Sequence, residues 1–285
     1  MAKQPKDFAA SVRQRLLNLA REEGQVFDEV LVAFGLERLV YRLSVSDYRD
    51  RFVLKGGMLV TLWTADTGRF TRDIDFLAFG SDEETELKAA FSAIFAIDGG
   101  DGLVYDTASL TAVAIREDQI YGGMRLRTDA YLGNTRIPIT VDLGFGDALG
   151  DPSYEIEYGS LLDFPAASIR AYSPATVIAE KFQAVVALGL ANSRMKDLYD
   201  LWTLPKSVDI EMAALADAIR GTFTRRGTIV PVSCPVGLSA EFFADSAKMT
   251  QWRAYSNGTT LQGKPLDQVT SEIWSWLEAA CKAAS

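Results

Sequence analysis

The chain has 285 residues, 48% of them hydrophobic, which is enough to bury the core of one large domain or of two smaller ones. Its formal net charge of -9 argues against a protein that coats nucleic acid non-specifically. It contains no histidine, which excludes Ser-His-Asp hydrolases, Cys-His proteases and H-E-x-x-H zinc enzymes. Metal chemistry in this chain must therefore use oxygen ligands, which favour magnesium, manganese or calcium.

The first third of the chain combines helices with two short strands. Apolar residues recur at helical spacing between about Asp7 and Leu43, which predicts two or three helices. A short strand over 51–55 ends at Gly56-Gly57, and a helix begins near Met58. Polar and apolar residues alternate over 73–79, which predicts a second strand. A helix over 82–95 follows, with acidic residues in its first turn.

Strands continue through the middle of the chain, and helices follow. Further strands are expected over 110–115, 124–131 and 137–143, with Gly122-Gly123 and Gly133-Asn134 as hairpin turns. Ser173-Pro174 is a typical helix start, and helices are expected over 174–190, 193–204, 209–222, 240–254 and 265–283. The pattern predicts an α+β protein with an N-terminal helical segment (1–50), a core of strands and helices (51–160) and a C-terminal helical domain (161–285).

The sequence also predicts where the protein resides. Its apolar runs, such as 177–179 and 184–188, are far shorter than the roughly 20 residues that a membrane span requires. The N-terminus has no apolar segment typical of a secretory signal, and Cys234 and Cys281 show no disulfide-framework spacing. We therefore expect a cytoplasmic protein without a membrane partner.

Three aspartates on predicted strands form the candidate metal site. Asp73 and Asp75 are two residues apart, so they share one face of a strand, and they repel each other unless a cation or water separates them. An edge strand with one wet face would give the same pattern. Asp142 also alternates with apolar residues on a later predicted strand. If that strand is adjacent to the first, Asp142 would join the pair and complete a magnesium site. Gly56-Gly57 upstream presents backbone N–H groups that suit phosphate.

Lys181 occupies an apolar helical stripe, which is unusual for a lysine. Its side chain must extend to solvent, pair with a carboxylate, or face an anion in a cleft. Asp197 and Asp200 on the next helix are three residues apart, and either could orient Lys181 or contact substrate. A local pair between Lys196 and Asp200 is the simpler alternative.

Taken together, these segments resemble a known family. The stretches Leu54-Lys-Gly-Gly-Met-Leu, Arg69-Phe-Thr-Arg-Asp-Ile-Asp-Phe76, and Glu180-Lys181 followed by Arg194-Met-Lys-Asp-Leu-Tyr-Asp-Leu201 are similar to those of AbiEii/AbiGii-type nucleotidyltransferase toxins, which are close to the MenT toxins. The resemblance covers roughly residues 51–202. One departure is that Gly56-Gly57 replaces the glycine-serine of the wider fold, which removes a hydroxyl from the triphosphate cradle.

The resemblance implies a fold, an activity and roles for individual residues. It implies a polymerase-β-like nucleotidyltransferase core whose catalytic residues are Asp73, Asp75, Asp142, Lys181 and Asp197. The first three would bind Mg2+, with Mn2+ as an alternative, and Lys181 would neutralise phosphate charge. Substrate-binding positions would be Lys55, Gly56, Gly57, Arg72 and Asp200.

The resemblance also implies substrates and partners. The substrate would be an NTP, the acceptor the 3′ end of tRNA, and a cognate antitoxin protein a further partner. Because the chain is acidic, tRNA would dock through a limited basic patch, for which Arg220, Arg225 and Arg226 are the candidates. Two alternatives stay open: the same fold modifying a small molecule or protein, and a non-catalytic nucleotide-binding regulator.

Overall fold

A computed structural model of the chain describes residues 8–66, 68–115, 122–147 and 154–284. These residues form two compact units, each assembled from separate segments. The sheet unit contains the described residues of 1–58, 70–146 and 153–171. The helical unit contains those of 59–69, 147–152 and 172–285. The N-terminal helices therefore belong to the same unit as the strands, whereas the expected division at residues 50 and 160 stays a prediction.

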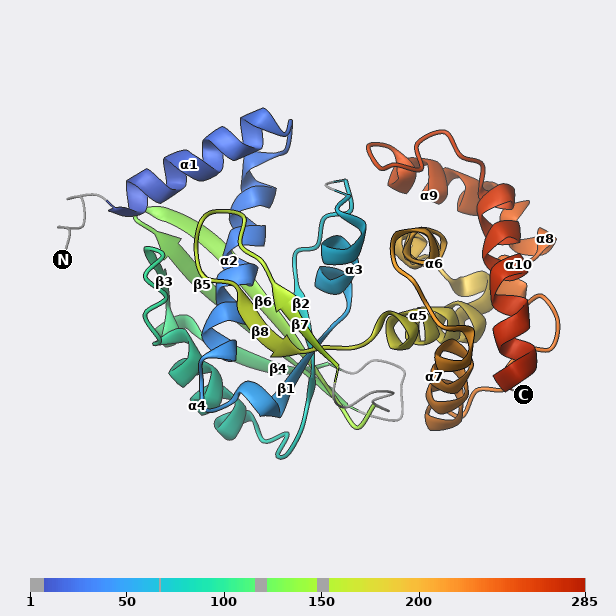
Figure 1. Cartoon of the computed structure of the whole chain (residues 1–285), viewed down its shortest axis with the longest axis horizontal. Coiled ribbons are helices and arrows are strands. Elements are labelled where there is room, and N and C mark those ends of the chain that lie inside the picture. The colour runs from blue at the N-terminus through green and yellow to red at the C-terminus, as the bar shows by residue number, and fades with distance from the viewer. Residues whose placement is uncertain (1–7, 67, 116–121, 148–153, 285) are drawn as a thin grey trace. The chain divides into compact units, whose positions relative to one another are not determined.

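The sheet unit is built around a mixed six-stranded sheet in the order β1-β2-β6-β5-β3, with β4 also paired to β5 (Figure 1). Strands β2 and β6 are parallel, and the other pairs in this sheet are antiparallel. Strands β7 and β8 form a separate hairpin. The elements are α1 (Phe8–Glu22), α2 (Phe27–Ser44), β1 (Phe52–Lys55), β2 (Ile74–Ala78), α4 (Glu84–Phe95), β3 (Leu103–Tyr105), β4 (Thr111–Ile115), β5 (Gly123–Leu132), β6 (Thr135–Phe145), β7 (Glu155–Tyr158) and β8 (Ala167–Arg170).

Helix α2 packs on one face of the sheet and leaves the other face polar. A Cβ built on Gly35 of α2 would lie 2.9 Å from Ile139 and 3.3 Å from Ile137 of β6, so this glycine lets the helix approach the sheet closely. Alternate residues of β5 and β6 on this side are buried, and the intervening residues are wholly or partly exposed. Asp142 belongs to the second set, so its carboxylate lies on the face that α2 does not cover.

Buried charges connect α2 to the loop before β3. Arg38 and Arg42 of α2 both bond to Asp101, at 2.9 and 2.6 Å, and all three side chains are almost completely buried. Burial alone would raise the pKa of Asp101, but the hydrogen bonds and charges of the two arginines hold it below its ordinary value. Glu37, which precedes Arg38 on α2, accepts hydrogen bonds from the Ser160 hydroxyl and the Leu161 N–H.

The helical unit contains α5 (Pro174–Leu188), α6 (Met195–Ser207), α7 (Met212–Arg225), α8 (Ala240–Phe243), α9 (Ser246–Ser256) and α10 (Leu266–Ala284). Helix α3 (Gly57–Thr64) begins in the sheet unit and continues into this one. Helix α5 starts as predicted, with the Ser173 hydroxyl accepting from the Thr176 N–H and Pro174 at the first position. By length and composition, residues 174–191 could span a membrane, but 56% of the stretch is buried inside the structure, as in a core helix.

The predicted α+β class is confirmed, with a mixed sheet and a helical region after it, but several local predictions need correction. Gly123 pairs with Gly144 inside β5 and is not a turn residue, and the β4–β5 connection falls largely outside the described residues. The helix expected over 240–254 is two helices, because Asp245 caps the N–H groups of Ala247 and Lys248 and starts α9. The strands β3, β7 and β8 were not expected from the sequence.

Candidate active site

Two of the three predicted carboxylates lie directly opposite each other. Asp75 of β2 and Asp142 of β6 are register partners across a parallel strand pair. This confirms the expectation that an adjacent strand brings Asp142 to the Asp-x-Asp pair. Asp73 immediately precedes β2 instead of lying in it, and its Oδ1 accepts a hydrogen bond from the Thr71 hydroxyl at 2.9 Å.

Arg125 is a fourth member of this cluster that the sequence reasoning missed. It lies on β5 opposite Asp142, and its Nε and Nη2 atoms donate to the two Asp142 oxygens at 2.7 and 2.6 Å. The hydrogen bond to Asp142 raises the pKa of Arg125, and the negative charges of Asp142, Asp73 and Asp75 raise it further, while burial opposes them. One guanidinium is therefore placed among three carboxylates.

Gly56 is required where the chain passes the Asp75 carboxylate. Its φ of +74° lies in the left-handed region, and a Cβ at this position would be 2.2 Å from Asp75 Oδ2. Gly57 then begins α3, and Lys55 is the register partner of Asp75 on β1. The predicted substrate-binding segment Lys55–Gly57 thus lies beside one of the predicted metal ligands. Its contact with substrate stays a prediction.

The donor chemistry of this cluster fits a divalent cation. Within the described residues, no group of three or more His, Cys, Asp or Glu side chains is arranged to hold a metal ion, and the Asp142 carboxylate is bonded to Arg125 instead. The candidate ligands are nevertheless all carboxylates, which magnesium and manganese prefer. The negative charges of these carboxylates favour a cation beside them, and in this structure that cation is the Arg125 guanidinium.

The helical unit contains a second charged cluster, centred on Lys181. Lys181 is only 7% exposed, and its Nζ lies 2.9 Å from Asp197 Oδ1 and 2.7 Å from Asp200 Oδ2. Of the three possibilities for this lysine, the structure shows pairing with carboxylates. Burial alone would lower the pKa of Lys181, but the charges of Asp197 and Asp200 outweigh it and raise the pKa above its ordinary value.

Arg69 and Arg194 complete the Lys181 cluster. Arg69 makes two hydrogen bonds to Asp200, at 2.6 and 2.7 Å, and Arg194 Nε lies 2.6 Å from Asp197 Oδ2. Both aspartates have an exposed fraction of zero. Asp200 therefore bonds to Arg69 and Lys181, and the alternative of a local pair with Lys196 is not what the structure shows. Direct substrate contact by Asp197 or Asp200 stays a prediction.

The remaining candidate cations differ in accessibility. Arg72 is 79% exposed and lies 3.7 Å from Glu29, so its guanidinium is accessible to an anion. The Arg226 side chain is only 13% exposed and pairs with Glu180 at 2.8 Å. Arg220 donates to the carbonyls of Ala283 and Ala284 at the end of α10. These contacts correct the expectation of an exposed basic patch at Arg220, Arg225 and Arg226, since two of the three guanidinium groups bond within the helical unit.

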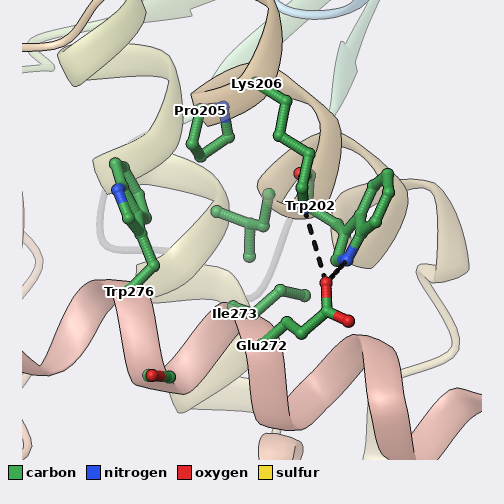
Figure 2. A pocket seen from close by; sticks show the side chains of 8 residues that line it. Trp202, Pro205, Lys206, Glu272, Ile273 and Trp276 are labelled. Carbon is green, nitrogen blue, oxygen red and sulfur yellow. Dashed lines mark hydrogen bonds and ion pairs between the residues drawn. The ribbon is translucent and has the colours of Figure 1, made fainter.

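The helical unit contains a cavity of about 450 Å³, which is lined by different kinds of residue from the two charged clusters (Figure 2). Trp202 and Trp276 face it, and Glu272 accepts a hydrogen bond from Trp202 Nε1 at 2.6 Å. Lys206 and Lys264 lie 3.5 and 3.1 Å from Glu272, so the charged groups here pair with one another. The other lining residues are Leu201, Pro205, Ile273 and Ser275. Nothing in this lining resembles a group-transfer site.

Comparisons with known proteins identify a family. The family model described as nucleotidyl transferase AbiEii toxin, Type IV TA system, matches residues 38–279, which include every predicted site residue. Two similar solved structures come from Helicobacter pylori. JHP933 has 14% sequence identity and a TM-score of 0.48, and the match covers 87% of this chain and 90% of that one. A protein assigned as a nucleotidyltransferase has 14% identity and a TM-score of 0.46, and the match covers 87% of this chain and 92% of that one. At these TM-scores the structural likeness carries no argument about function. The search of curated proteins found no match.

Proposed function

Because the chain belongs to the AbiEii nucleotidyl transferase toxin family of Type IV toxin–antitoxin systems, we propose that it transfers a nucleoside monophosphate from an NTP to the 3′ end of tRNA and so blocks translation. Family membership implies a transferase with an NTP substrate and a cognate antitoxin, in agreement with the expected polymerase-β-like core. The acceptor, the metal and the cytoplasmic location are part of the proposal.

The observation that supports this proposal most directly is the alignment of Asp75 with Asp142 on parallel strands, with Asp73 at the start of β2. These three residues would hold Mg2+, or Mn2+, which neutralises triphosphate charge when bound. Gly56 keeps the backbone close to the Asp75 carboxylate, so that N–H groups at the start of α3 are available to phosphate oxygens. Lys55 and Arg72 supply positive charge in the same unit.

In the proposed reaction, the acceptor hydroxyl oxygen forms a bond to the α-phosphorus, and the bond from that phosphorus to the pyrophosphate oxygen breaks. The Asp142 carboxylate assists removal of the hydroxyl proton, which passes to solvent. In the helical unit, Asp197 and Asp200 hold Lys181 protonated, because their charges favour the ammonium form. The protonated Lys181 would supply the positive charge that a phosphate-neutralising residue needs.

The direct test is an in vitro transfer assay with each radiolabelled NTP, magnesium and total cellular RNA. The Asp75→Asn variant should lose label transfer while retaining its fold, because one of several repelling carboxylates is removed. Asp129→Asn is a matched control, since Asp129 lies on the same polar sheet face but pairs with Arg136 at 2.7 Å. Equal transfer by Asp75→Asn and the wild type, or full transfer in EDTA, would contradict the proposed site.

The cellular test measures growth and tRNA ends together. Induction without a partner should arrest growth and lengthen tRNA 3′ ends, whereas Asp75→Asn should do neither. Co-expression of a cognate antitoxin should relieve the arrest. Sequencing of tRNA 3′ ends before and after induction gives the readout. Growth arrest with unaltered tRNA ends would mean that the acceptor is not tRNA but another molecule, such as a small molecule or a protein. Absence of arrest would refute toxicity.

A further inference from the structure

The Arg125–Asp142 pair is a bidentate ionic contact at the candidate active site. Both guanidinium donors on one edge of Arg125 bond to both oxygens of Asp142, at 2.7 and 2.6 Å. We propose that Arg125 is an exchangeable counter-ion, which occupies Asp142 in the metal-free protein and must leave before a divalent cation can bind there. The proposal rests on the proposed function, because it assigns Asp142 as a metal ligand.

The Arg125 guanidinium and a divalent ion would compete for the Asp142 carboxylate. The bidentate guanidinium takes up one lone pair on each Asp142 oxygen, and a divalent ion needs at least one of these oxygens at about 2.0–2.6 Å. The positive charge of Arg125 also repels a cation held by Asp75, which lies next to Asp142 across the strand pair. Competition for the carboxylate oxygens and charge repulsion therefore both favour departure of the guanidinium when the ion binds.

Accessibility makes the exchange feasible. The Arg125 side chain is 35% exposed, whereas that of Asp142 is 16% exposed. A partly exposed arginine can turn toward solvent and regain hydration, while the less exposed carboxylate stays in place for the incoming ion. By contrast, Arg38 and Arg42 around Asp101 are 1% exposed and have no such route. Their pairing is structural, and that of Arg125 is suited to exchange.

The competing explanation is that Arg125 only cross-links β5 to β6, as many cross-strand pairs do. The two explanations predict different effects on metal affinity. If Arg125 competes with the cation, its removal tightens metal binding. If it only cross-links β5 to β6 and thereby holds Asp142 in position, its removal weakens metal binding or leaves it unchanged.

The experiment measures Mn2+ binding to the full-length, nucleotide-free protein by the electron paramagnetic resonance signal of free Mn2+. Arg125→Gln should bind Mn2+ about tenfold more tightly than the wild type, which corresponds to about 1.4 kcal/mol. Arg127→Gln is the matched control, because Arg127 lies two residues away on the same strand and face, opposite Thr140, and has no ion-pair partner within the described residues. It should bind like the wild type, and a thermal melt checks that both variants fold.

Each outcome decides a separate point. Equal or weaker binding by Arg125→Gln, with Asp75→Asn abolishing binding, would overturn the exchange proposal and leave the metal site intact. Equal tightening by Arg127→Gln would also overturn it, because general charge removal would then explain the effect. Failure of the wild type and Arg125→Gln to bind Mn2+ would overturn both the exchange and the metal-dependent function.

Discussion

The substitution Asp200→Asn tests how strongly the Lys181 cluster stabilises the helical unit. Asp200 has zero exposure and accepts three charge-assisted hydrogen bonds, two from Arg69 and one from Lys181, at 2.6–2.7 Å. Asparagine keeps the shape but places amide donors against two cations that are 2% and 7% exposed. Breaking a buried ion pair on one side costs about 3–5 kcal/mol, which for a chain of this size lowers Tm by roughly 6–20 °C.

The assay is thermal and urea unfolding of the wild type, Asp200→Asn and a control, Asp217→Asn. Asp217 is in the same unit and pairs with Arg220 at 2.6 Å, but its side chain is 75% exposed, so its loss should cost about 0–1 kcal/mol. Burial would raise the pKa of Asp200, yet the charges of Lys181 and Arg69 hold it below 3.8. The stabilisation from Asp200 is therefore present above pH 3.8 and lost as pH falls further.

Two results would refute this reasoning. If Asp200→Asn and Asp217→Asn shift the melt equally, burial does not decide the strength of these pairs. Adding Arg69→Met to Asp200→Asn should restore part of the lost stability, since it removes an uncompensated buried charge. An additive further loss would mean that Arg69 contributes through packing and not through its charge.

Three further predictions concern other parts of the chain. Gly56→Ala should lower the free energy of unfolding by about 1–2 kcal/mol, because alanine disfavours the left-handed backbone, and it should also weaken Mn2+ binding, because its Cβ would contact Asp75. Gly80→Ala, with φ +86° and its nearest contact at 3.9 Å, should show only the loss of stability. Equal Mn2+ binding by the two variants would contradict the effect of the Asp75 contact. Burial raises the pKa of Glu37 to about 7, so the free energy of unfolding of the wild type should fall by up to about 3 kcal/mol as pH rises from 4.5 to 7. Urea unfolding at pH 5 and pH 8 should show a smaller difference between the two pH values for Glu37→Gln than for the wild type. Lys181→Met leaves each buried aspartate with one arginine, so it should destabilise less than Asp200→Asn yet lose most transfer; unchanged turnover would make Lys181 purely structural.

Local sequence signals predicted most of the sheet and the carboxylate pair. The turn at Gly133-Asn134 was recognised, and counting outward from it places Arg125 seven residues before Leu132 and Asp142 seven residues after Thr135. The Arg125–Asp142 pair could thus have been derived from the hairpin. The Asp245 cap that separates α8 from α9 was equally visible in the sequence.

Other features depend on contacts that a sequence does not show. Arg69 and Asp200 are far apart in the chain, and no periodicity connects them. The strands β3, β7 and β8 have three or four residues each, too few for a clear alternating pattern. The apolar stripe around Lys181 indicated an unusual lysine correctly, but only the fold could identify both of its carboxylate partners.

The interleaving of the two units affects how this protein can be divided. The chain leaves the sheet unit after residue 58, returns at residue 70, leaves it again after residue 146 and enters the helical unit for the last time at residue 172. A fragment cut at 171–172 would therefore lack Arg69, and its Asp200 would lose the guanidinium that makes two of its three hydrogen bonds. Because neither unit is one continuous segment of the chain, no single proteolytic cut can release either of them whole.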